Sequence, residues 1–167
     1  NGPHRTVRCV ELTLHPLPEG KERPISLPAN SRISIPAWSP DGKQILFESS
    51  RGGDNQLWVI PIGGGEARQV TKISTEATSA VWSGDGKKIA FVSAVWPEYS
   101  DKPFKQSDEL NSKRKEENER NPVKAKVFTQ LFYRHWDDYV EDKRQHLFVV
   151  DFDPAAHSVP EPRDVTP

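Results

Sequence analysis

The sequence has a single cysteine, Cys9, and no methionine. One cysteine excludes an intrachain disulfide bond and a cluster of metal-binding thiolates. Long apolar runs are also missing: none approaches the roughly 20 residues that a membrane-spanning helix needs, so we expect no membrane span. The five histidines show no metal-binding spacing such as H-E-x-x-H, and the sequence therefore predicts neither a metal nor a cofactor.

Neither sign of charge dominates the chain. Lys and Arg number 23, Asp and Glu number 24, and the net charge is −1. This balance gives no electrostatic reason to expect a nucleic-acid partner or an anionic membrane. A disulfide-free chain suits the cytoplasm and equally the periplasm, and without a targeting signal the compartment stays open. Because residues 1–5 resemble neither a signal peptide nor a natural start, we expect an internal part of a longer protein.

The sequence contains one motif twice, called the tryptophan phrase below. P-A-W-S-P-D-G-K-Q-I-L-F occupies residues 36–47, and S-A-V-W-S-G-D-G-K-K-I-A-F occupies residues 79–91. The two tryptophans are 44 residues apart, a period that suggests one four-stranded propeller blade per repeat. In each copy we expect the tryptophan to pack in the blade and the Asp-Gly pair to form a turn. These structural repeat residues are Trp38, Asp41, Gly42, Trp82, Asp85 and Gly86.

The repeat predicts an all-β fold: a partial β-propeller of four-stranded antiparallel blades with one helical insertion. Residues 1–30 would end a preceding blade, because part of their pattern returns 45 residues later. Residues 31–75 would form a complete blade. Residues 76–167 would form a further blade with a long insertion at about 94–142. Such a set does not close a ring, since propellers use roughly four to eight blades.

Turn signals and apolar patterns also predict individual strands. We expect the two blades to end in the same way, at residues 68–71 and 163–166. The expected strands cover residues 44–48, 56–62 and 67–71 in the first repeat and residues 89–92, 146–152 and 162–166 in the second.

The insertion contains a helix candidate at residues 107–119. Ser107 or Asp108 is expected to cap its start, and Pro122 bars its continuation. Leu110 is its only large apolar residue, so we expect the helix to lie on the surface. Two interpretations stay open: a solvated helix in a long loop, or a lid over a substrate channel. Three oppositely charged pairs have i,i+4 spacing: Glu109–Lys113, Lys115–Glu119 and Glu116–Arg120. After the helix, residues 127–136 are expected to return as a strand.

The tryptophan phrases resemble the repeats of TolB-like proteins and of the prolyl oligopeptidase family. Four further segments follow in order, within and after the insertion, at residues 122–128, 132–137, 143–149 and 162–167. Together these resemble the N-terminal propeller of the dipeptidyl-peptidase and acylaminoacyl-peptidase branch of that family of serine peptidases. The resemblance covers residues 36–167 well.

This resemblance implies a parent serine exopeptidase whose propeller restricts entry to short peptides. The catalytic α/β-hydrolase domain is absent from the sequence, which has no G-x-S-x-G nucleophile motif. The chain itself is therefore predicted to be non-catalytic, and no catalytic residue is assigned. The implied partners are a short peptide substrate and the parent's hydrolase domain and remaining blades.

The resemblance also implies a place for substrate contact. A peptidase that binds a free α-amino group needs a carboxylate nearby, because a desolvated ammonium must be paired. Acidic propeller residues supply it in related dipeptidyl peptidases, and Asp137, Asp138 or Glu141 could do so here. Arg134 and Trp136 complete the candidate substrate-binding set.

Two alternatives compete with this reading. Arg134 and Asp137 could form a structural ion pair while Trp136 packs in the blade. The chain could also be part of a TolB-like propeller that binds proteins and has no hydrolase activity. An acid–base role for His135 with Asp137 is disfavoured, because no nucleophile is recognisable nearby.

Overall fold

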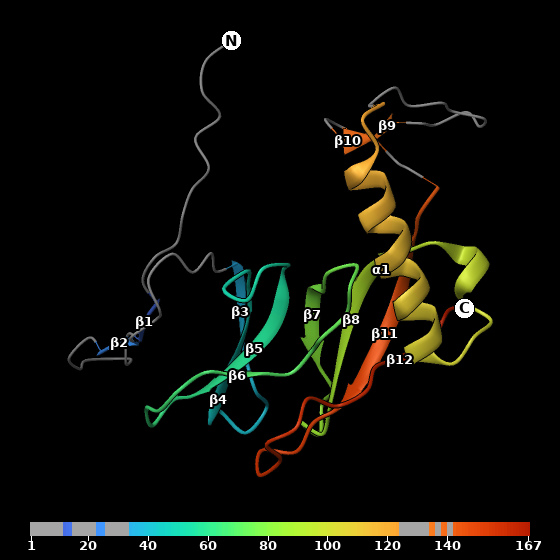
Figure 1. Cartoon of the computed structure of the whole chain (residues 1–167). Helices are drawn as coiled ribbons and strands as arrows, with labels where there is room; N and C mark the ends of the chain where they lie inside the picture. The colour runs from blue at the N-terminus through green and yellow to red at the C-terminus, as the bar shows by residue number, and fades with distance from the viewer. Residues whose placement is uncertain (1–11, 15–22, 26–33, 124–133, 136–137, 140–141) are drawn as a thin grey trace.

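Two four-stranded antiparallel sheets lie side by side in the computed structural model of the chain (Figure 1). The structure describes residues 12–14, 23–25, 34–123, 134–135, 138–139 and 142–167. The first sheet, called the first blade below, has strands β3 (Ser34–Trp38), β4 (Gln44–Ser49), β5 (Gln56–Pro61) and β6 (Arg68–Gln69) in that order. The second blade has the order β7 (Thr78–Trp82), β8 (Lys88–Val95), β11 (Arg144–Asp151) and β12 (Arg163–Asp164). The predicted all-β class and its four-stranded blades are confirmed.

Smaller elements accompany the blades. Strands β1 (Leu12–Leu14) and β2 (Arg23–Ile25) pair with each other near the N-terminus. Between β8 and β11 lie the short 3-10 helix η1 (Pro97–Tyr99), the helix α1 (Phe104–Arg120) and the paired strands β9 (Arg134–His135) and β10 (Asp138–Tyr139). Within the part of the chain that the structure describes, no helix is long and apolar enough to cross a membrane.

The tryptophan phrase ends in the same hydrogen-bonded turn in both blades. In the first blade, the Ser39 hydroxyl donates to Asp41 Oδ1 at 2.6 Å, and the same oxygen accepts the Lys43 N–H at 3.1 Å. In the second blade, Ser83 and Asp85 repeat this bond at 2.6 Å. The hydrogen bonds of the turn therefore account for an aspartate at this position of both repeats, as the sequence predicted.

Glycine is required in these turns because the backbone enters the left-handed region. Gly42 has a φ of 68° and Gly86 a φ of 69°, values that residues with a Cβ atom adopt only at a cost. The near-identical angles show that the two turns share one conformation. The predicted Asp-Gly turns at Asp41–Gly42 and Asp85–Gly86 are confirmed.

These turns should make the fold acid-sensitive. The serine hydroxyl, and then the backbone N–H two residues on, hold the pKa of Asp41 and of Asp85 below the ordinary value of 3.8. A carboxyl whose pKa is lower in the folded state stabilises the fold above its unfolded pKa, and this contribution disappears as the pH falls through the folded pKa. We therefore expect both turns to weaken below about pH 4.

Carboxyl-carbon NMR titration of the chain measures both pKa values directly. Replacing the donor, in Ser39→Ala or Ser83→Ala, should raise the pKa of the aspartate in the same blade and leave the other unchanged. A pKa of 3.8 or above for both aspartates in the unmodified chain would contradict this account.

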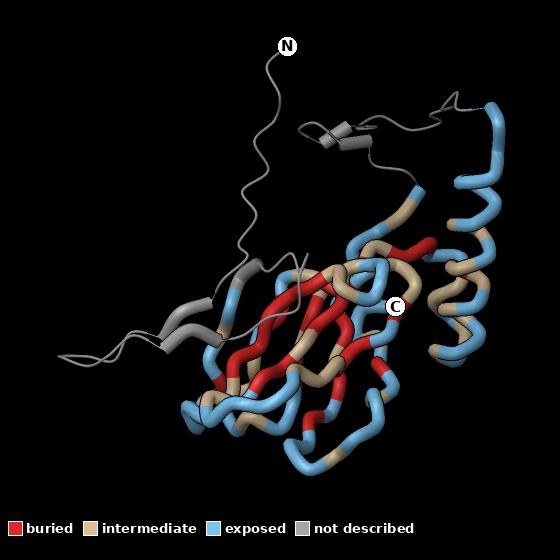
Figure 2. The backbone as a smooth tube through the Cα atoms, turned by 60° about the vertical axis from the view of Figure 1, so that its left-hand side comes forward, coloured by how far each residue is buried: buried red, intermediate tan, exposed pale blue. Residues whose placement is uncertain are grey.

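The main hydrophobic core fills the space between the two blades (Figure 2), where the buried stretches of both sheets face each other. Phe91 and Phe148 stack at its centre with ring centroids 5.6 Å apart. A smaller cluster, formed by Ile45, Phe47 and Ile60, lies on the opposite face of the first blade. Strands β4 and β5 are therefore apolar on both faces, as strands packed between two layers must be. The main core includes Leu46, Leu57, Val59, Val70, Ile89, Phe91, Phe148 and Val150.

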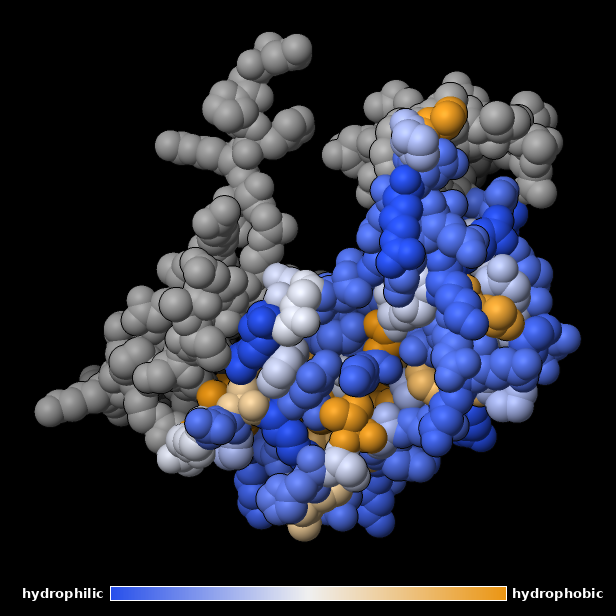
Figure 3. Space-filling view, viewed as in Figure 1, coloured by the Kyte–Doolittle hydropathy of each residue, from blue (hydrophilic) through white to orange (hydrophobic). Residues whose placement is uncertain are grey.

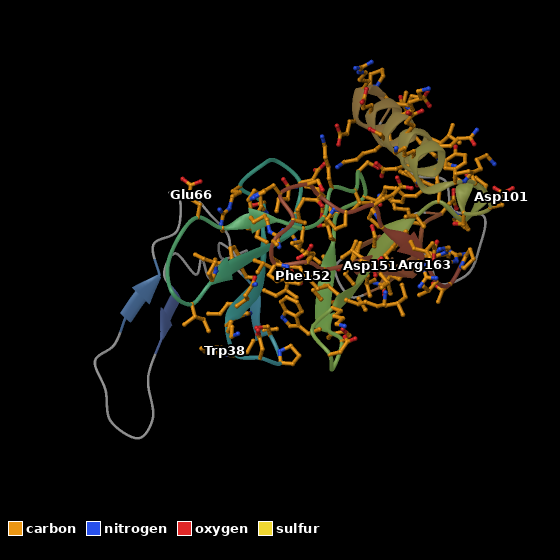
Figure 4. The ribbon with its side chains drawn as sticks, turned by 90° about the horizontal axis from the view of Figure 1, so that it is seen from below. Trp38, Glu66, Asp101, Asp151, Phe152 and Arg163 are labelled. Atoms are coloured by element: carbon orange, nitrogen blue, oxygen red, sulfur yellow. The ribbon has the colours of Figure 1, made fainter. Side chains whose placement is uncertain are left out.

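Polar contacts fix the junction between the blades. Trp82 Nε1 donates to the carbonyl of Ala37 at 3.3 Å, and its ring meets Phe152 edge-on at 4.8 Å; Figure 4 shows Phe152 between the two sheets. The buried carboxylate of Glu48 accepts the N–H of Ser79 at 2.7 Å. Ser79 has a φ of 54°, so Glu48 holds a strained residue at the start of the second blade.

Trp38, the equivalent of Trp82, does not pack in this way. It is 55% exposed, and the prediction that it packs against a blade is wrong in this structure. The physical reason is its position: Trp82 reaches back to the preceding blade, and the described residues contain no four-stranded sheet on the corresponding side of β3.

The two blades end in equivalent hydrogen bonds. The Thr71 hydroxyl accepts the Leu57 N–H, and the Thr166 hydroxyl accepts the Leu147 N–H, both at 2.9 Å. In each blade the valine just before the threonine donates its N–H to the same leucine, also at 2.9 Å. The predicted correspondence of residues 68–71 and 163–166 is confirmed.

Candidate functional site

The two ends of the insertion lie next to each other in the second blade. It departs after Val95 at the end of β8 and returns at Arg144 at the start of β11, and these two residues pair with each other in the sheet. The chain on both sides of the insertion is therefore fixed by the blade. The elements between them are held by the contacts described next.

Trp96 is the centre of these contacts. Its side chain is only 2% exposed, and its backbone N–H donates to Asn111 Oδ1 at 3.0 Å. Two cations lie over its ring, the Arg114 guanidinium at 5.0 Å and the Lys143 ammonium at 4.7 Å from the centroid. Residues from the entrance, the helix and the exit of the insertion thus meet at one indole ring, and cation–π attraction holds them together.

Apart from Phe104 at its start, helix α1 contacts the blades through polar side chains. Figure 3 shows the α1 side of the molecule as largely hydrophilic, as expected for a helix with one large apolar residue in its middle. Its buried side chain is Asn111, 1% exposed, whose amide also donates to the Ser107 carbonyl at 2.8 Å. The prediction of a surface helix is confirmed, but one polar side chain of the helix is buried and hydrogen-bonded.

The start of α1 differs from the prediction. The helix begins at Phe104, after Pro103, and has no side-chain cap, so a start at Ser107 with Ser107 or Asp108 as the cap is wrong. Phe104 packs on the main core and meets the Phe148 ring at 6.5 Å, and this tertiary contact favours the earlier start. Asp108 instead accepts bonds from the N–H and the hydroxyl of Ser74, each at 2.8 Å.

The same helix connects both blades. Lys115 forms an ion pair with Asp54 of the β4–β5 loop at 2.7 Å and donates to the carbonyl of Ser74 at 3.2 Å. Ser74 lies in the segment that joins the first blade to the second. Among the predicted i,i+4 pairs, Glu116 and Arg120 lie 3.3 Å apart. The helix therefore holds the β4–β5 loop of the first blade and the segment that joins the two blades.

The candidate substrate-binding residues fall beyond this helix. Arg134 in β9 pairs with Tyr139, and Asp138 in β10 pairs with His135, so one short hairpin carries Arg134 and Asp138. Figure 1 shows this hairpin past the C-terminal end of α1. Trp136, Asp137 and Glu141 lie outside the described residues, as do the alternative Arg134–Asp137 ion pair and most of the return strand expected at 127–136.

The structure also contains a polar cluster that the sequence did not predict, formed by His146, Asp164 and Ser100. His146 Nδ1 lies 2.7 Å from Asp164 Oδ2 and 3.5 Å from the Ser100 hydroxyl. A catalytic Ser-His-Asp relay needs the serine and the aspartate on different ring nitrogens, whereas both contact Nδ1 here. The cluster therefore fastens β11 to β12 and to η1 and has no relay geometry. In the described ranges, no group of three His, Cys, Asp or Glu side chains could hold a metal ion.

Four-stranded blades stacked through an apolar core define part of a β-propeller. Residues 18–112 match the sequence model of the family described as TolB beta propeller domain. The chain belongs to this family.

Relatives of the chain include peptidases. It is 31% identical over 115 residues to dipeptidyl-peptidase 5 of Porphyromonas endodontalis, covering 68% of this chain and 15% of that protein. It is 44% identical over 59 residues to the uncharacterized peptidase YuxL of Bacillus subtilis, covering 35% and 9%. The predicted resemblance to the propeller portion of a peptidase is confirmed by these relatives.

Other relatives share the propeller. The Tol-Pal system protein TolB of Anaeromyxobacter sp. (strain K) is 45% identical over 73 residues, covering 44% of this chain and 17% of that protein. Among solved structures, Pyrococcus horikoshii acylaminoacyl peptidase superposes with a TM-score of 0.55 at 17% identity, covering 92% of this chain and 20% of that one. The superposition supports the fold. The chain spans a fifth or less of the length of each of these relatives.

Proposed function

We propose that the chain is the non-catalytic propeller portion of a serine exopeptidase, of the dipeptidyl or acylaminoacyl type, and that it gates the access of short peptides. One observation carries this proposal: the insertion of the second blade is anchored to both blades, through Phe104 to Phe148 of the second blade and through Lys115 to Asp54 of the first. A surface helix in a passive loop needs no such attachment. Long, structured insertions in compact folds are often functional.

The way in which the helix is held supports the gating role. Phe104 at its start packs on the main core, hydrogen bonds and ion pairs hold the rest, and its outer face is exposed. An element held in this way gives that end of the blades a defined rim. We infer that the rim selects short peptides and that the hairpin with Arg134 and Asp138 lies where they pass.

Recognition of the peptide's N-terminus is the finer part of the proposal. Asp137, Asp138 or Glu141 would pair with the free α-ammonium group, and Arg134 and Trp136 would contact the rest of the peptide. The parent's hydrolase domain and further blades would complete the enzyme, and residues 1–30 would belong to a preceding blade. Support comes from the peptidase relatives and from the hairpin that carries Arg134 and Asp138.

In the full-length enzyme, Asp137→Ala should raise KM for peptides with a free N-terminus more than for N-blocked peptides. Loss of a charge-assisted hydrogen bond weakens binding by about tenfold or more. Steady-state kinetics with a matched pair of free and acylated substrates measures the difference. Asp101→Ala is the control, because Asp101 is an exposed aspartate of the same insertion whose charge partner is Lys102. Equal changes for both substrates would favour the structural Arg134–Asp137 pair.

A TolB-like propeller without hydrolase activity is the second candidate, favoured by the TolB relatives. A fluorophosphonate probe, which labels active serine hydrolases, separates the two functions when applied to the native full-length protein. Labelling that is lost after heat denaturation would support the peptidase. An unlabelled, folded protein that retains a bound protein partner would support the second candidate.

A further inference from the structure

Unsatisfied polar groups are concentrated on one face of the first blade. Among the described residues, the buried side-chain nitrogen and oxygen atoms without a hydrogen-bond partner are Ser49 Oγ, Arg51 Nε and Nη2, and Trp58 Nε1. Ser49 and Trp58 lie on the same side of the sheet as Phe47, because side chains alternate along a strand and Phe47 pairs with Trp58. This is the face turned away from the second blade.

Arg51 is held over this face by two aromatic rings. Its guanidinium carbon lies 4.2 Å from the centroid of the Trp58 ring and 5.4 Å from that of Phe47. Burial lowers the pKa of Arg51 because the charge has lost part of its water. The atoms Nε and Nη2 form one edge of the guanidinium, the edge that donates two parallel hydrogen bonds to a carboxylate or a phosphate. That whole edge is buried without an acceptor.

The second blade shows that the fold does not require these donors. Phe148 occupies the position of Trp58, since Phe91 pairs with Phe148 as Phe47 pairs with Trp58. Phenylalanine has no N–H group to satisfy. Ser93, the repeat equivalent of Ser49, donates to the Glu76 carbonyl at 2.6 Å. The unsatisfied donors therefore belong to the first blade alone, and a bound acceptor would account for them.

We propose that Arg51 and Trp58 form a binding site for a carboxylate group. The Nε–Nη2 edge of Arg51 donates to its two oxygens, and the Trp58 indole N–H donates a third bond. One guanidinium neutralises the single charge of a carboxylate beside the Trp58 and Phe47 rings. A phosphate dianion would leave an uncompensated charge in this poorly solvated place. Arg51 lies in the same β4–β5 loop as Asp54, the partner of Lys115 in α1.

NMR of the 15N-labelled chain tests the site, because the Arg51 Nε–H and Trp58 Nε1–H signals report on their own hydrogen bonds. The probe is succinate, with uncharged succinamide and inorganic phosphate in parallel at constant ionic strength. We expect succinate to shift both signals saturably and to slow their exchange with water, while succinamide does not. Arg51→Lys keeps the charge but loses the planar edge, and Trp58→Phe copies the second blade. Each should weaken succinate binding by at least about tenfold. Arg120→Lys on the exposed end of α1 is the control and should change nothing.

The outcomes separate the possible sources of the carboxylate. Shifts that appear only with succinate identify a site for free carboxylates. A Trp58 Nε1–H signal that is already shifted and protected without any addition, and that loses this shift and protection in Arg51→Lys, identifies a carboxylate supplied by the chain itself. Signals that stay unshifted and exchange rapidly under all conditions overturn the proposal, because water alone then satisfies the donors. Tighter binding of phosphate than of succinate overturns the choice of carboxylate.

Discussion

Replacing Trp82 by alanine should lower the free energy of unfolding by about 3 kcal/mol, as expected for loss of a large aromatic side chain from a packed junction. The change removes the hydrogen bond to the Ala37 carbonyl and the edge-on contact with Phe152. It also opens a space between the two blades. Urea denaturation followed by circular dichroism measures the effect.

Trp38 provides the matched control because it occupies the same place in the repeat. It is 55% exposed, so Trp38→Ala should cost less than about 1 kcal/mol. Equal losses for the two variants would mean that Trp38 is covered in solution. Such a result would assign Trp38 a junction like the one that Trp82 makes.

Asn111→Leu should have the second large effect on stability. Leucine has the same number and branching of side-chain heavy atoms but cannot accept the Trp96 N–H or donate to the Ser107 carbonyl, so the buried Trp96 N–H loses its partner and the Ser107 carbonyl loses one of its bonds. An unsatisfied buried group costs about 1–3 kcal/mol. Hydrogen exchange of the Trp96 amide should accelerate, and urea denaturation should report the loss of stability.

Gln106→Ala is the control for Asn111→Leu, since Gln106 lies on the same helix and is exposed. It should leave both measurements unchanged. If Trp96 exchange accelerates without a change in global stability, the insertion detaches locally while the blades stay folded. Unchanged Trp96 exchange in Asn111→Leu would contradict the anchoring role of Asn111.

Local sequence signals were sufficient for the turns and for the identity of the strands. The Asp-Gly pairs dictate a left-handed glycine and a short connection, and the pattern around them predicts β4 and β8. The strand expected at 89–92 extends over Lys88–Val95 in the structure. It is longer because Arg144 and the residues after it pair with the whole of β8, and such pairing across the insertion is not visible locally.

Tertiary contacts decided where the sequence failed. Ser107 and Asp108 have the chemistry of a helix cap, but Phe104 packs on Phe148 and Asp108 binds Ser74. Likewise, nothing near Trp38 in the sequence indicates that it is exposed while Trp82 is covered.

The polar sites illustrate the same limit. His146 meets Asp164 only because β11 pairs with β12. The Arg51–Trp58 site depends on a strand pairing that places Trp58 opposite Phe47, and on the unsatisfied donors that only coordinates reveal. Residue type alone would assign Arg51 to a solvated turn.

The threonine at the end of each blade has a consequence for the solubility of the fold. A sheet edge with free N–H groups can recruit strands from other molecules and begin aggregation. The outermost strands β6 and β12 have only two residues each, and beyond them the Thr71 and Thr166 hydroxyls take up the N–H groups of Leu57 and Leu147. A threonine side chain thus accepts the backbone hydrogen bond of the third strand at a position where the backbone of the edge strand no longer pairs with it. Each blade protects its third strand from intermolecular pairing at the point where its own edge strand stops.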